Sequence, residues 1–74
     1  MEPLVQVMQR RAAWIVRYNG TEQAVLGSQE RALEAARSLL ESTGGLILVH
    51  GHTGAIVARQ TVPSPITHRV LARA

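Results

Sequence analysis

The fold is decided by residues 28–49, which read SQERALEAARSLLESTGGLILV. Ser28 has a hydroxyl that suits a helix N-cap, and a glycine pair at 44–45 is typical of a helix C-terminus. Between them, apolar side chains recur at helical spacing: Leu33, Ala36 and Leu40. We therefore predict a helix from Gln29 to about Thr43. The four residues that follow, 46–49, are all apolar, which predicts an interior strand.

Toward the N-terminus, the same reasoning predicts three strands. Residues 4–9 alternate in polarity, and residues 13–18 form a second alternating segment that places Trp14, Val16 and Tyr18 on one face. The two segments differ in phase, so we expect a tight turn near residues 10–12. Asn19-Gly20 is a strong hairpin signal, because both residues tolerate a positive φ, and it should lead into a third strand over residues 22–26.

Toward the C-terminus, residues 50–54 predict a turn and residues 55–62 a last strand. Pro63-Ser64-Pro65 reads as a stiff linker to a short basic tail, residues 66–74, which either docks on the sheet or frays. The expected fold is α+β, in the order β-β-β-α-β-β: an antiparallel sheet of about four or five strands with one long helix on one face. We expect a single domain over residues 1–62.

Composition limits the classes of protein that this chain can belong to. Its 74 residues suffice for one domain, and the absence of cysteine excludes disulfides and cysteine-based zinc sites. No apolar run is long enough to span a membrane. The first residues carry an acid where a secretion signal would carry basic residues, so we expect a cytoplasmic location and no membrane partner.

The order of these motifs resembles a known family. The motifs are Trp14-Ile15-Val16 followed by the Asn19-Gly20 turn, the alanine-rich helix segment at residues 30–37, and an apolar strand that runs into a His-Gly-x-x-Gly turn at residues 50–54. Over roughly residues 5–62 the chain is similar to the small bacterial family called domain of unknown function 2188. The resemblance implies the strand–helix–strand order and a bacterial or phage origin, and it implies no activity.

Residues that could carry chemistry are few. His50 and His52 alternate, and a His-x-His pair can hold a metal ion when a third ligand is near, but nothing in the sequence fixes one there. No nucleophile has a recognisable base and orienting group, and there is no lysine for a phosphate-binding loop. We therefore expect no enzyme activity, no cofactor and no metal.

The sheet face opposite the helix is the more informative region. If Leu46 and Leu48 face the helix, this face carries an aliphatic patch made of Ile15, Ile47, Val49 and Val57. Arginines flank the patch: Arg10, Arg11, Arg17 and Arg59.

Three occupants of this face remain open. The patch can associate with a second copy or another protein, which predicts a non-enzymatic binding module and a homodimer. The arginines can instead contact a nucleic-acid backbone or an acidic partner. In the third alternative, the tail covers the face through Ile66, Val70 and Leu71.

Overall fold

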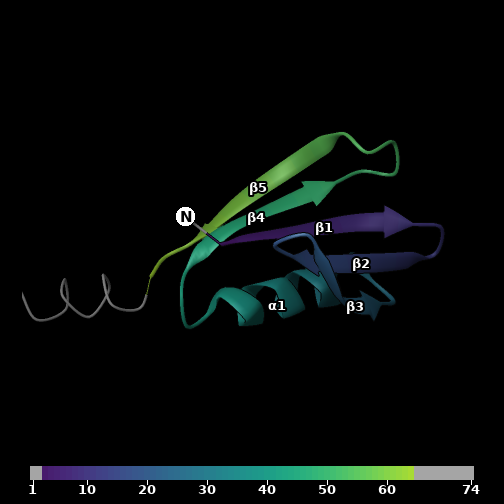
Figure 1. Ribbon diagram of the computed structural model, residues 1–74. Helices are drawn as coiled ribbons and strands as arrows, with labels where there is room; N and C mark the ends of the chain where they lie inside the picture. The colour runs from purple at the N-terminus through teal and green to yellow at the C-terminus, as the bar shows by residue number, and fades with distance from the viewer. Residues whose placement is uncertain (1–2, 65–74) are drawn as a thin grey trace, which may run out of the picture.

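The computed structural model describes residues 3–64, which form a five-stranded sheet with one helix packed across one face (Figure 1). The elements are β1 (Leu4–Arg10), β2 (Ala13–Tyr18), β3 (Thr21–Leu26), α1 (Gln29–Leu40), β4 (Gly45–His50) and β5 (Ile56–Val62). The predicted class and element order are confirmed. The predicted tail, residues 66–74, lies outside the described residues.

The strands are arranged in the order β3-β2-β1-β4-β5, so β1 is central and β3 and β5 are the edges. Three of the four pairings are antiparallel, but β1 and β4 are parallel, which makes the sheet mixed. The parallel pairing follows from α1, because the helix returns the chain to the end of the sheet where β1 begins, as in a crossover connection.

Two tight turns connect the first three strands. The predicted turn near residues 10–12 is a two-residue loop, Arg11-Ala12, because Arg10 pairs with Ala13, and Arg11 adopts a left-handed φ of 57°. Asn19 and Gly20 have φ values of 48° and 88°, as a primed hairpin turn requires. Asn19 also ties the turn to β1, because its Oδ1 accepts a hydrogen bond from the Leu4 amide at 3.0 Å.

The helix starts where the sequence predicts and ends three residues earlier. Ser28 caps the N-terminus by accepting a hydrogen bond from the Arg31 amide at 3.2 Å. At the other end, the Glu41 amide donates to the Ser38 carbonyl, which tightens the last turn. The Gly44 amide then donates to the Leu40 carbonyl at 2.7 Å, and residues 41–43 form turns rather than regular helix.

The glycine pair also allows the chain to cross itself closely. A Cβ atom on Gly44 would lie 2.8 Å from the Ser64 backbone nitrogen and 2.9 Å from the Val62 carbonyl oxygen. A Cβ atom on Gly45 would lie 2.6 Å from the Pro3 carbonyl oxygen. Both approaches are shorter than real Cβ contacts allow, so only glycine fits where the helix end, β4 and the two ends of the described chain meet.

The core lies between the sheet and α1. Its fully buried members come from β1, β2, β4 and the helix: Val5, Val7, Val16, Ala32, Ala36, Leu40, Ile47 and Val49. Trp14 and Tyr18 pack against this cluster, as the predicted face of β2 requires.

The predicted orientation of β4 is wrong. Ile47 and Val49 pair in register with the core residues Val5 and Val7, so they lie beneath α1 and are inaccessible to a partner in the folded protein. Leu46 and Leu48 occupy the opposite face.

Candidate functional site: the open face of the sheet

The open face is the side of the sheet away from α1, and strand register arranges its residues in rows that run across the strands. The charged row, from β3 to β5, is Glu22, Arg17, Gln6, Leu48 and Arg59. The apolar row, in the same order, is Val25, Ile15, Met8, His50 and Ile56. Leu4, Leu46 and Thr61 form a third, shorter row. Register shifts in β3 and β5 leave Gln23 and Val57 as extra residues.

An ion pair crosses the open face over β2. Arg10 Nη1 lies 3.8 Å from Glu22 Oε1, although Arg10 is on β1 and Glu22 is on β3. Arg10 pairs with Ala13 and Glu22 pairs with Arg17, so the line between them passes over Ile15, midway along that part of β2. Ile15 is only 2% exposed, although no helix covers this face. Ile15 is therefore on the predicted face but is already covered.

Half-buried aliphatic side chains form the centre of the open face. They are Leu4, Met8, Leu46 and Leu48. Sequence reasoning missed all four as interface residues. For Leu46 and Leu48 the cause is that the apolar run 46–49 gives no alternation that would orient β4. The parallel pairing of β1 with β4 carries that signal, since it matches Leu46 to Leu4 and Ile47 to Val5.

Exposed aliphatic side chains lie at the two ends of the apolar row. Val25 on β3 and Ile56 on β5 are each 57% exposed, and the neighbouring Val57 is 64% exposed. Among the four residues predicted for the apolar patch, Val57 alone is accessible. The two edges of the sheet thus present apolar groups to solvent, which is typical of a contact surface.

The four predicted arginines are placed on or beside the open face but do not form one cluster. Arg17 and Arg59 belong to the charged row and are separated by three inter-strand spacings, about 14 Å. Arg10 is engaged with Glu22, and Arg11 is exposed in the β1–β2 turn.

Charge differs between the two sides of the molecule. Among the described residues, Glu22 is the one carboxylate on the open face, against Arg10, Arg17 and Arg59. The helix and its C-cap residue, Glu41, together carry three carboxylates and two arginines: Glu30, Glu34, Glu41, Arg31 and Arg37. The open face is therefore basic and the helix side is slightly acidic.

His50 is held by hydrogen bonds of its own. Its Nδ1 lies 3.1 Å from the Gly54 carbonyl oxygen, and because a carbonyl only accepts, Nδ1 carries the proton and donates. Nε2 then accepts from the Gln6 side-chain amide at 3.4 Å. Both ring nitrogens of His50 are thus occupied, and His52 is exposed in the following turn. Within residues 3–64, no three potential metal-ligating side chains gather at one place.

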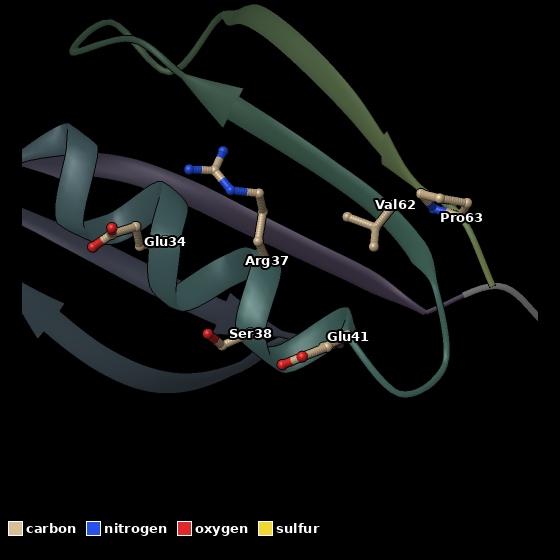
Figure 2. A pocket seen from close by; sticks show the side chains of 6 residues that line it. All are labelled: Glu34, Arg37, Ser38, Glu41, Val62 and Pro63. Atoms are coloured by element: carbon tan, nitrogen blue, oxygen red, sulfur yellow. The ribbon is translucent and has the colours of Figure 1, made fainter. Parts of the chain in front are cut away.

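A shallow groove lies between α1 and β5 on the helix side (Figure 2). It has a volume of about 520 Å³ and is lined by Glu34, Arg37, Ser38, Glu41, Val62 and Pro63. Arg37 Nη1 donates to the Gln60 side-chain oxygen at 3.3 Å, which joins the helix to β5 beside the groove. The lining includes a hydroxyl and two carboxylates but no histidine, and the groove is open to solvent. Such a lining offers no nucleophile paired with an oriented base.

No helix within residues 3–64 has the length and apolar character needed to cross a bilayer.

Comparison with known proteins places most of the described chain in one family. A family model described as "Uncharacterized protein conserved in bacteria (DUF2188)" matches residues 5–62. The match covers the helix and every strand except the first residue of β1, and it agrees with the resemblance found in the sequence motifs. No curated protein and no solved structure matches the chain.

Proposed function

We propose that this chain, which belongs to the bacterial family DUF2188, is a non-enzymatic binding module that acts by protein–protein association through the open face of its sheet, and that it forms a homodimer. One observation carries the proposal: α1 covers one face of a five-stranded sheet, while the other face has an aliphatic centre and a rim of arginines. An aliphatic centre with a polar rim is the usual composition of a protein interface.

The chemistry of the described residues supports association rather than catalysis. His50, which belongs to the apolar row of the open face, already uses both ring nitrogens in hydrogen bonds. The groove beside α1 is open to solvent, and its lining pairs no nucleophile with an oriented base. A small domain with a thin core also gains stability from burying further apolar surface in an interface.

Sedimentation velocity over a concentration series from about 10 μM to 1 mM tests the proposal. The wild-type chain should associate within this range, because association would bury the aliphatic centre of the open face and the exposed Val25 and Ile56. Leu48→Glu should abolish association, since it places a charge at the aliphatic centre. Ser38→Glu, which adds the same charge on the exposed helix, is the matched control and should associate like wild type. A wild-type chain that stays monomeric at 1 mM would refute the homodimer.

The excess of arginine on the open face favours a second candidate, a nucleic-acid-binding module. Arg17 and Arg59 lie on the same row, and Arg11 is exposed at one end of the sheet. Both aromatic side chains, Trp14 and Tyr18, pack against the core, so this binding would rest on phosphate contacts without base stacking. Fluorescence anisotropy with labelled single-stranded DNA should then show binding at low salt that weakens steeply as salt is added. No binding at low salt would exclude this candidate.

A further inference from the structure

We propose that the second copy packs face to face on the open face about a two-fold axis that runs along β1, and that Arg59 of each copy pairs with Glu22 of the other. This inference rests on the proposed homodimer and specifies its geometry. It follows from where the charged and exposed apolar residues stand in the rows of the sheet.

The central position of β1 determines which strands meet across such an axis. A two-fold rotation about an axis parallel to β1 exchanges the two edges of the sheet. As a result, β3 of one copy faces β5 of the other, and β2 faces β4. The rotation does not change the position of a residue along the strand direction. Residues at the two ends of one row therefore meet each other across the interface.

The ends of the charged row have opposite charge. Glu22 is at the β3 end and Arg59 is at the β5 end, so the rotation brings each arginine opposite a carboxylate, twice in the dimer. Packed sheets lie about 10 Å apart, a distance that an arginine and a glutamate can bridge together. Arg17 would face Leu48 of the second copy, and Arg10 remains engaged with its own Glu22.

The ends of the apolar row also match. Val25 at the β3 end would meet Ile56 at the β5 end, and Val57 lies beside Ile56. These three residues are the exposed large aliphatic side chains of the described structure. The same rotation that pairs the charges would therefore bury Val25 and Ile56 against each other.

The charges also discriminate against the other face-to-face arrangement. A two-fold axis that runs across the strands along the charged row would place Glu22 against Glu22 and Arg59 against Arg59. Like charges directly opposed in an interface are unfavourable. An axis along β1 instead places each arginine against a glutamate. We therefore favour the axis along β1 over the axis across the strands.

Charge reversal tests the pairing. Arg59→Glu alone and Glu22→Arg alone should each weaken self-association at least tenfold, because each variant opposes like charges at both ends of the row. Mixed in equal amounts, the two variants should form a heterodimer with close to wild-type affinity, since every opposed pair is again unlike. Arg31→Glu is the matched control, because Arg31 lies on the helix, and it should leave self-association unchanged. Far-UV circular dichroism checks that each variant is folded.

Weakening of each single variant identifies the axis, because an axis across the strands would weaken neither variant relative to wild type and would also oppose unlike charges in the mixture. Single variants that associate like wild type would therefore overturn the β1 axis. A wild-type dimer whose two variants remain monomeric when mixed would overturn the β1 axis and leave association through the open face standing. A wild-type monomer would overturn both.

A second measurement covers the case in which Glu22→Arg does not fold. The chain has no native cysteine, so Glu22→Cys and Arg59→Cys each provide a unique thiol. A short bis-maleimide should cross-link a mixture of the two variants far more than either variant alone. Equal cross-linking in all three samples would overturn the pairing.

Discussion

Substituting Gly44 with alanine should destabilise the protein strongly, whereas the same substitution at Gly20 should cost much less. Both glycines have a left-handed backbone, with φ values of 75° and 88°. They differ in surroundings. A Cβ on Gly44 would collide with the backbone of Val62 and Ser64 at 2.8–2.9 Å, whereas a Cβ on Gly20 would have nothing within 4 Å. The comparison therefore separates backbone strain from close packing.

The expected loss of unfolding free energy has two contributions, backbone strain and close packing. An alanine in the left-handed region costs about 1–2 kcal/mol, and this is the whole cost at Gly20. At Gly44 the neighbouring backbone must also move, and overpacking of this kind adds about 1–3 kcal/mol. We therefore expect Gly44→Ala to lower the free energy of unfolding by about 2–5 kcal/mol, a large part of the roughly 4–11 kcal/mol that a chain of this length has.

Urea denaturation monitored by tryptophan fluorescence measures both variants, because Trp14 is the single tryptophan and it packs against the core. The difference in unfolding free energy between Gly44→Ala and Gly20→Ala should be at least about 1 kcal/mol. Equal losses of unfolding free energy at the two positions would refute the close contact of Gly44 with the backbone of Val62 and Ser64.

Three further substitutions test local features of the fold by the same denaturation assay. Asn19→Ala should cost about 1–2 kcal/mol, because it removes the acceptor for the Leu4 amide and places alanine at a φ of 48°; an unchanged midpoint would show that the turn does not need this hydrogen bond. Arg11→Gly should raise the free energy of unfolding by up to about 1 kcal/mol, because glycine relieves the left-handed φ of 57°, and a loss of stability would mean that the arginine side chain stabilises the turn. Ser28→Ala should lower the free energy of unfolding by about 1 kcal/mol through loss of the N-cap, whereas Ser28→Asp should keep both the cap and the stability. Equal losses of stability in the two variants would show that the cap is not the cause.

Much of the fold could be predicted because its signals are local. Asn19-Gly20 specifies a hairpin turn from two residues, and Ser28 marks the helix start through one hydroxyl. The alternation of Trp14, Val16 and Tyr18 likewise gave the correct face of β2, since one face of that strand is larger and more aromatic than the other.

The remaining features depend on contacts between distant segments. The run Leu46–Val49 is apolar at every position, so its orientation is decided by pairing with β1, some forty residues away in sequence. Ile15 is buried on the open face, below the line that joins Arg10 on β1 to Glu22 on β3, and neither of these residues is on the strand that carries Ile15. Sequence reasoning therefore placed Arg17 and Arg59 on the side of the sheet away from α1, where the structure has them, but it wrongly placed Ile47 and Val49 on that side as well.

Methyl NMR spectra recorded between about 10 μM and 1 mM test the claim that the open face is the contact surface, because they distinguish the two sides of the sheet. We predict that the methyl signals of Met8 and Leu48 shift with concentration, while those of Val7 and Val49, beneath α1, stay fixed. Concentration-dependent shifts at α1 with none at Met8 and Leu48 would contradict it.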